Sequence, residues 1–320
     1  MRYTAVFMLS RRCCAVIVRL IQAIATWISN GPRGPLVLLV TLFSHHALGQ
    51  ETLSVFVSIT PQKYFVEKIG GSHVTVHVMV GPGQNPVTYE PTIKQMAALH
   101  RSVLYHRIGI GFEKAWMARI TAANPDMRVV DARDAIELRR METAAEVFGQ
   151  SLHEPDHGGE QDPHFWTDPM LVKAVSRQLM EQFTAMDPAH KNAYESHFRH
   201  FAAELDALHA DIKKLLADKR GAKFMVFHPA WGYFAHTYGL RQVPIELQGR
   251  EPGAKTLAAL IDYARTNGIR VLIVQKQFSR RAATTIAAAI HGEVVSIDPM
   301  QENYLQSMRW MAAVIAGAAT

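Results

Sequence analysis

From about residue 50 to its end, the chain alternates short runs of β-branched residues with stretches of helical pattern. Strands are predicted at residues 53–59, 74–80, 102–108, 128–131, 223–227, 241–245, 270–274 and 293–297. Helices are predicted at about 61–70, 92–100, 112–123, 230–238, 253–267, 280–290 and 300–317, and one more begins near 168. Such alternation is typical of α/β proteins, in which helices cover a parallel sheet.

One long helical run, residues 187–218, interrupts this alternation. It opens with an Asp-Pro step, and its apolar residues recur every three or four positions: Phe198, Phe201, Leu205, Leu208, Ile212 and Leu215. The sequence therefore predicts two α/β lobes, 50–186 and 219–320, joined by a connecting helix at 187–218. A ligand is expected in the cleft between the lobes, outside the carboxyl ends of the strands.

The positive charge of the chain lies mostly in its first 49 residues. The formal net charge is +6, and residues 1–49 hold five arginines but no lysine, aspartate or glutamate. The remainder therefore carries only 6 − 5 = +1. No basic stripe is left to meet a phosphate backbone, so a nucleic-acid partner is not expected.

The same N-terminal segment, 1–49, resembles a secretory signal. Arg33 precedes an apolar run, "PLVLLVTLF" (35–43), and small residues follow at Ala47 and Gly49. Cleavage is expected after Gly49, so the mature protein is expected to be exported. The run is too short for a stable transmembrane helix, so no lasting membrane insertion is expected. The alternative is an N-terminal anchor.

Cysteine is confined to this leader. Cys13 and Cys14 are the only two in the chain, so the mature protein has no disulfide and no thiolate. Any metal site must therefore use histidine, aspartate or glutamate side chains. No cysteine stands at the expected cleavage site, and a lipid anchor there is not expected.

Three candidate metal ligands stand next to prolines that stiffen the backbone. His164 lies between two Asp-Pro steps in "QDPHFWTDP" (161–169), His228-Pro229 follows the strand at 223–227, and Asp298-Pro299 follows the strand at 293–297. Two imidazoles and a carboxylate form a ligand set that suits zinc. Each residue also has a structural explanation: a hydrogen-bonded His228, a helix-capping Asp298, and a His164 packed by Trp166.

Other histidines receive no metal role. His190, His197, His200 and His209 lie on the predicted connecting helix and are expected on its solvated face.

Several motifs, in order, resemble those of the solute-binding proteins of bacterial zinc and manganese ABC importers, the zinc-uptake branch in particular. The resemblance covers roughly residues 52–318. Its motifs are "GPGQNPVTYEP" (81–91), "IGIGFEKAW" (108–116), the "DPHFWTDP" segment, "VFHPAWGYFAHTYGL" (226–240), "ELQGREPGAKTL" (246–257), "VQKQFS" (274–279) and "SIDPM" (296–300). It implies two similar lobes, a rigid connecting helix and a metal between the lobes.

The resemblance also implies the ligands. The second histidine ligand of the family falls on His164, the third on His228 and the carboxylate on Asp298. Histidine at the third position resembles the zinc branch, because the manganese branch usually has glutamate there. The first histidine would follow Pro86, where this chain has Val87.

Valine cannot bind a metal, so the fourth position needs another group. Water is the first choice, because an exposed position needs no rearrangement. Glu90, His106 and the loop histidines His153 and His157 are the protein alternatives.

The resemblance implies a monomeric periplasmic receptor that delivers Zn²⁺, with Mn²⁺ as second choice, to an inner-membrane ABC permease and its ATPase. No catalysed reaction is expected. One competing hypothesis is a zinc metallohydrolase with Glu90 as general base, although no HExxH run is present. The other is a metal-independent adhesin or accessory protein that has lost its site.

Overall fold

The computed structural model of the protein describes residues 52–142, 161–247 and 249–318. The expected leader (1–49) and the loop histidines His153 and His157 lie outside these residues. Across the described ranges, no helix combines the length and the apolar character needed to cross a bilayer.

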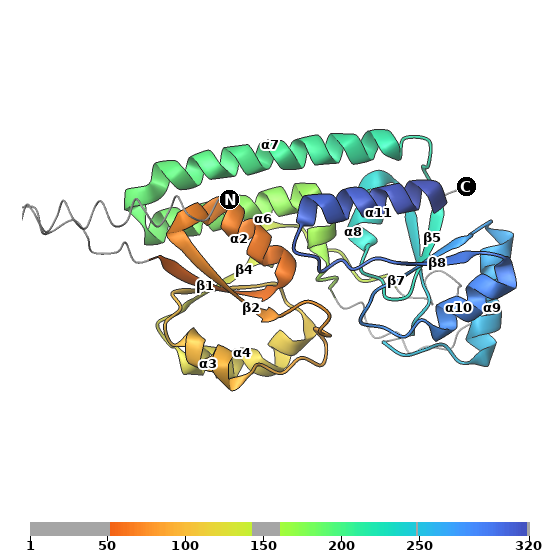
Figure 1. The fold of residues 1–320 in the computed structure, drawn as a ribbon, viewed down its shortest axis with the longest axis horizontal. Coiled ribbons are helices and arrows are strands. Elements are labelled where there is room, and N and C mark those ends of the chain that lie inside the picture. Colours follow the sequence, from red (N-terminus) through yellow and green to blue (C-terminus); the bar gives the residue numbers. More distant parts are fainter. Residues whose placement is uncertain (1–51, 143–160, 248, 319–320) are drawn as a thin grey trace, which may run out of the picture. The chain divides into compact units, whose positions relative to one another are not determined.

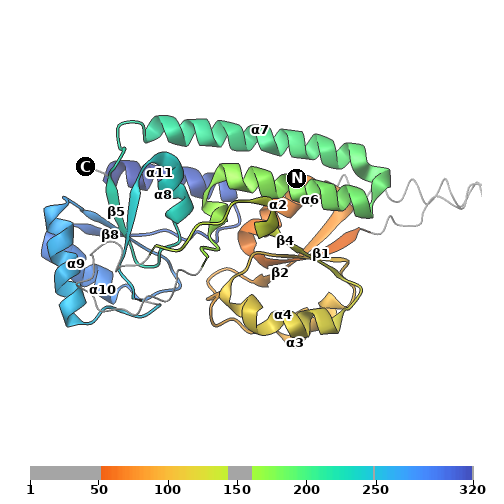
Figure 2. The same cartoon turned by 180° about the vertical axis from the view of Figure 1, so that it is seen from behind.

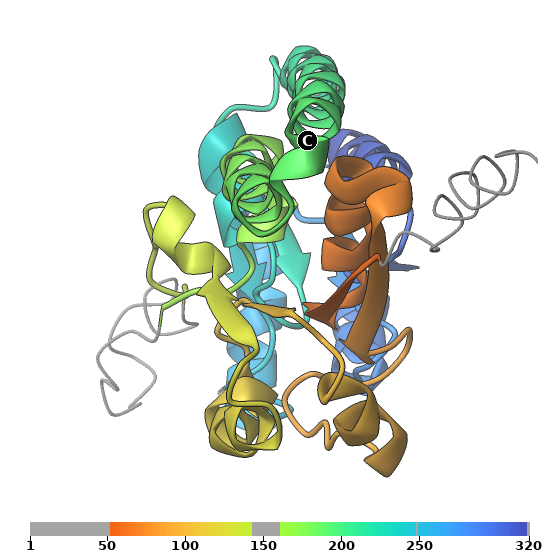
Figure 3. The same cartoon turned by 90° about the vertical axis from the view of Figure 1, so that its left-hand side faces the viewer.

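The N-terminal lobe is built on a parallel sheet of four strands in the order β2-β1-β3-β4. The strands are β1 (Leu53–Ile59), β2 (Val74–Val80), β3 (Leu104–Arg107) and β4 (Arg128–Asp131). Helices α2 (Thr60–Gly70) and α6 (Pro169–Met186) cover one face, and α3 (Ile93–Leu99) and α4 (Gly111–Ala123) cover the other (Figures 1 and 3).

The C-terminal lobe repeats this design with strand order β6-β5-β7-β8, again all parallel. Its strands are β5 (Lys223–Val226), β6 (Arg241–Pro244), β7 (Val271–Val274) and β8 (Glu293–Ser296), and its helices are α8 (Gly232–Tyr238), α9 (Ala254–Thr266), α10 (Arg281–Ile290) and α11 (Tyr304–Ala318) (Figure 2). The predicted α/β fold with two parallel sheets is confirmed.

Both faces of the second sheet are buried at its two central strands, β5 and β7, which explains why these strands are almost wholly apolar. Phe224 and Val226 belong to the large core that also holds residues of α8 and α11. Met225 and Phe227 point the opposite way, into a separate core with residues of α9 and α10.

The connecting helix is slightly shorter than predicted. A 3₁₀ turn spans Pro188–His190, and α7 proper runs over Lys191–Leu215. The Tyr194 hydroxyl donates to Asp187 Oδ2 over 2.7 Å and holds this turn against the helix. Figures 1 and 2 show α7 alongside α6 and α11, on which it packs. Most of the predicted stripe is buried, but Leu215 is 45% exposed because the helix ends there and Leu216 takes the buried position.

The expectation of a solvated histidine face on the connecting helix is wrong for three of its four members. His190 Nδ1 lies 2.6 Å from Asp187 Oδ2, in the turn that precedes α7. His197 Nδ1 lies 3.0 Å from the Ile69 carbonyl, and His209 Nδ1 lies 3.2 Å from the Tyr238 hydroxyl. These rings join the connecting helix to neighbouring helices. His200 is exposed, as expected.

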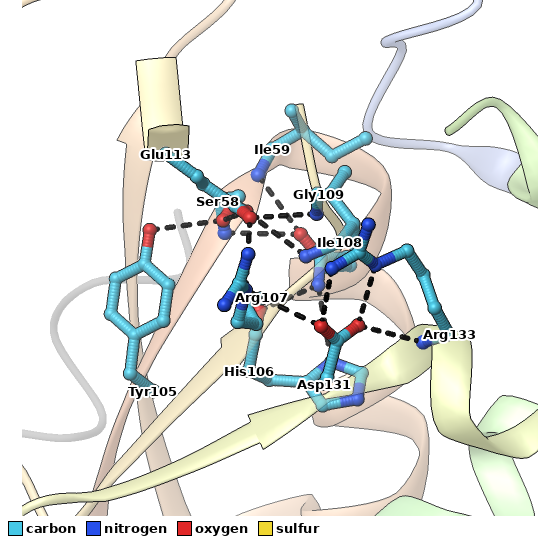
Figure 4. Close-up of polar contacts among 11 residues, drawn as sticks. Ser58, Ile59, Tyr105, His106, Arg107, Ile108, Gly109, Glu113, Asp131 and Arg133 are labelled. Carbon is cyan, nitrogen blue, oxygen red and sulfur yellow. Dashed lines mark hydrogen bonds and ion pairs between the residues drawn. The ribbon is translucent and has the colours of Figure 1, made fainter. Parts of the chain in front are cut away.

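A buried carboxylate closes the carboxyl edge of the N-terminal sheet (Figure 4). Glu113, fully buried, accepts from the Ser58 hydroxyl and from the backbone N–H groups of Ile108 and Gly109 at 2.9 and 2.6 Å. Burial raises the pKa of Glu113. Gly109 has φ +83°, and a Cβ there would collide with the Arg133 guanidinium. The loop that opens α4 is thus fixed from both sides.

His106 lies in the same edge and is fully buried. Its Nδ1 is 3.1 Å from the Gln62 side-chain nitrogen, which must donate, and its Nε2 is 3.3 Å from Gln178 Oε1, to which it donates. Burial lowers the pKa of His106 from 6.5 to about 4. The native protein therefore holds this ring neutral at pH values where the unfolded chain protonates it.

We predict that acid weakens the fold through His106. The neutral, buried His106 contributes to the free energy of unfolding in full above pH 6.5. This contribution is lost as the pH falls toward 4, because in that range the unfolded state takes up a proton that the folded state does not. The shift corresponds to about 3 kcal/mol of unfolding free energy. Urea unfolding at several pH values measures it, and His106→Gln, which cannot titrate, should show a shallower pH dependence. Equal slopes in both proteins would contradict the prediction.

Candidate metal centre

Each strand of the C-terminal sheet is followed by a polar side chain within two residues. In the order of the strands across the sheet, these are Glu246, His228, Gln275 and Asp298. Because the strands are parallel, their carboxyl ends share one edge, where ligands bind in open α/β sheets. His228 stands beside the point where the strand order reverses, between β5 and β7.

His164 reaches the same place from the start of α6. Asp168 caps that helix by accepting from Met170 N over 2.7 Å, with Pro169 in the first turn, as the Asp-Pro step predicts. The Thr167 hydroxyl donates to the His164 carbonyl over 2.9 Å. The backbone on the C-terminal side of His164 is therefore fixed by a short turn and a capped helix.

The two histidines meet through their Nε2 atoms, which are 3.3 Å apart. The rings are inclined at 73° with centroids 5.0 Å apart. Two imidazole nitrogens that bind one tetrahedral zinc ion at about 2.0–2.1 Å stand about 3.3 Å from each other. The pair is already spaced as zinc ligands would be.

A carboxylate stands behind each ring. His164 Nδ1 lies 2.7 Å from Asp162 Oδ1, and His228 Nδ1 lies 2.7 Å from Glu246 Oε1. A carboxylate only accepts, so each Nδ1 carries the proton and each neutral ring keeps the lone pair on Nε2. Burial lowers the pKa of His164, which favours the neutral ring.

The His228 main chain and ring are held from further sides. Gln275 Oε1 accepts from His228 N over 3.3 Å, and Gln275 Nε2 donates to the His228 carbonyl over 2.8 Å. The Phe278 ring stacks on the imidazole, with centroids 5.1 Å apart and planes 22° apart. Residues that follow β7 therefore position the residue that follows β5.

Asp298 has the backbone-capping role that its sequence position suggests. Its Oδ1 accepts from Met300 N over 2.9 Å and from Gln277 Nε2 over 3.2 Å, so it stabilises the turn after β8. Trp166 Nε1 donates to the Pro299 carbonyl over 3.1 Å, which brings this turn to the His164 segment. Within the described part of the chain, no group of three or more His, Cys, Asp or Glu side chains is placed to hold a metal ion. The structure thus joins the two histidines and leaves Asp298 nearby.

The protein alternatives for a further ligand are limited. Val87 is 61% exposed, so most of its side chain is in solvent, although it lies beside Gly111 at the start of α4. Its loop is anchored by Phe112 N, which donates to the Pro86 carbonyl over 3.1 Å. His106 is buried with both ring nitrogens bonded to amides, which excludes it from the site in this conformation. Glu90 is exposed.

Sequence reasoning assigned no role to Asp162, Glu246 or Gln275, which the structure places against the histidines. Asp162 stands two residues before His164, close enough for one turn to join them. Glu246 and Gln275 follow strands that flank β5 in the sheet. The strand-end rule, applied to every strand, would have found both.

Residues 55–318 match the family described as zinc-uptake complex component A, periplasmic. The high-affinity zinc uptake system protein ZnuA of Bacillus subtilis (strain 168) is 26% identical over 256 residues, covering 78% of this chain and 79% of that protein.

Two solved structures are also similar. A crystal structure of ZnuA is 37% identical with a TM-score of 0.77, covering 84% of this chain and 100% of that one. A zinc-bound ZnuA deletion mutant is 36% identical with a TM-score of 0.76, covering 84% and 99%.

We predict that Gly232→Ala destabilises the protein, because its Cβ would lie 2.9 Å from Asp162 Oδ2 and 3.1 Å from Gln242 Nε2. Crowding of this kind costs about 1–3 kcal/mol of unfolding free energy, measurable by urea denaturation. Gly317→Ala in α11 is the matched control, since its Cβ would meet open space. A Gly232→Ala protein as stable as the control would contradict the prediction.

Proposed function

Because the chain belongs to the zinc-uptake component A family, we propose that His164 and His228 bind the Zn²⁺ it carries, with Asp298 as a third protein ligand. Members of this family are substrate-binding proteins of ABC importers and not enzymes, so the metallohydrolase hypothesis is not supported. The function of the chain is zinc uptake. The observation that carries the ligand proposal is the 3.3 Å approach of the two Nε2 atoms.

Asp298 is proposed as the ligand that brings negative charge. Its Oδ1 is engaged by Met300 N and Gln277 Nε2, which leaves Oδ2 as the oxygen for the metal. The Trp166–Pro299 hydrogen bond supports this assignment, because a small movement of the turn after β8 would bring the carboxylate toward His164. Two imidazoles with one carboxylate favour Zn²⁺ over Mn²⁺, which prefers oxygen ligands.

Water is proposed for the fourth position, where the resemblance places a histidine and this chain has Val87. An exposed side chain at 61% leaves solvent access at that loop. Three protein ligands and one water form an open tetrahedral site, and the water is the ligand that exchanges.

The family works with ABC transporter components in the periplasm. We propose further that this chain acts as a monomer, that residues 1–49 are a cleaved export signal, and that the zinc passes to one inner-membrane permease and its ATPase. The proposed division is 50–186 and 219–320 for the lobes and 187–218 for the connecting helix.

We predict that His164→Ala and His228→Ala each weaken zinc binding by roughly tenfold or more, because each removes one of three protein ligands. Competition with a chromophoric chelator measures the affinity. His200→Ala is the control, since that histidine is exposed on α7. Wild-type affinity in either site variant would remove that residue from the site.

We predict that Val87→His tightens zinc binding and slows release, because a tethered nitrogen replaces an exchangeable water. The change should be tolerated, since the Val87 side chain is largely in solvent. Zinc release into excess chelator, followed by stopped flow, tests this. An unchanged or faster off-rate would show that the loop does not bring position 87 to the metal.

A further inference from the structure

We infer that Asp162 and Glu246 are positioning residues of the zinc site: without touching the metal, they fix the ligating tautomer of each imidazole and balance the charge of the cation. This inference rests on the proposed function. Each carboxylate contacts one histidine at Nδ1, on the side of the ring opposite the metal-facing Nε2.

Asp162 holds His164 in one orientation. Its side chain is 1% exposed, and Oδ1 accepts from both His164 N at 2.9 Å and His164 Nδ1 at 2.7 Å. One oxygen therefore fixes the main chain and the ring together. Asp162 is itself anchored, because its N–H donates to the Arg139 carbonyl over 2.8 Å and its carbonyl accepts from the Tyr233 hydroxyl over 3.0 Å.

Glu246 holds the His228 ring from the neighbouring strand end, while Gln275 holds the His228 main chain. Its N–H donates to the Phe227 carbonyl over 3.1 Å, and its Oε1 receives the His228 Nδ1 proton. Its Oε2 is buried and has no hydrogen-bond partner among the described residues. A desolvated carboxylate oxygen without a donor is costly, and a cation beyond the imidazole offsets that cost.

The carboxylates also supply negative charge beside a divalent cation. Two neutral imidazoles bring none, the proposed ligand Asp298 brings one negative charge, and Asp162 and Glu246 bring one each, so the site as a whole offsets the two positive charges of Zn²⁺. A carboxylate at Nδ1 also makes Nε2 a better donor to the metal. An amide in its place keeps the shape but removes the charge, and it can accept from Nδ1–H or donate to a bare Nδ1, so it no longer selects the tautomer.

The test compares Asp162→Asn and Glu246→Gln with the wild-type protein. Each should lower zinc affinity by roughly 10- to 100-fold in chelator competition, the usual effect of removing such a partner. The matched control is Asp187→Asn, which breaks a carboxylate–histidine pair of the same kind, 2.6 Å to His190, at the start of the connecting helix. Its zinc affinity should remain that of the wild type.

A second measurement separates positioning from folding. Nitrogen NMR of histidine side chains in the zinc-free protein at pH 8 should show the proton on Nδ1 of His164 and His228. In each amide variant the ring that lost its carboxylate should show a mixture of tautomers, while the thermal midpoint of the zinc-free protein stays close to the wild-type value. If one variant does not fold, the other is judged by the same criteria.

The outcomes distinguish this inference from the function on which it rests. If both amide variants bind zinc like the wild type while His164→Ala and His228→Ala lose it, the positioning role is overturned and the zinc site stands. Loss of zinc affinity in Asp187→Asn equal to that in the site variants would also overturn it. A wild-type protein that binds no zinc would overturn the proposed function instead.

Discussion

The structure of the site depends on one constraint, namely that two imidazoles from distant parts of the chain face each other with their Nε2 atoms 3.3 Å apart. Such an approach persists only if both rings are held from behind. Asp162 holds the His164 ring in this way, and Glu246 holds the His228 ring. The capped start of α6 fixes the backbone after His164, and Gln275 bonds to the main chain of His228. The proline next to each histidine limits the backbone further. At the site proposed here, zinc capture then needs little reorganisation of these two histidines.

The fold was largely predictable from the sequence because its elements are locally consistent. The runs at β1, β2 and β4 have the predicted bounds, and the other strands are shorter by one to three residues. The misses have local causes. Leu215 continues the apolar spacing of α7, but the helix ends at this residue, so its side chain is exposed. His197 and His209 look solvated on a single helix and find partners only in neighbouring helices.

The site was predictable only in part. His164 stands next to Pro163 shortly before α6, and His228 stands next to Pro229 shortly after β5. Both signals are present in the sequence alone. Glu246 becomes visible only once the sheet order places β6 next to β5, a tertiary fact that periodicity does not contain. Asp298 remains a proposal, because a capping aspartate and a ligating aspartate have the same sequence signature, and the metal itself decides between them.

The two lobes share one strand order but treat their carboxyl edges differently. Glu113, the buried carboxylate at the edge of the N-terminal sheet, already accepts hydrogen bonds from its neighbours (Figure 4). Zinc is therefore expected to add little to the stability of that sheet. The C-terminal edge keeps an unsatisfied oxygen on Glu246. Zinc bound at the proposed site therefore acts as a local stabiliser, because its binding free energy adds to the free energy needed to open the strand ends at β5 and β6. Amide hydrogen exchange should slow there on loading, while the N-terminal sheet exchanges at its own pace.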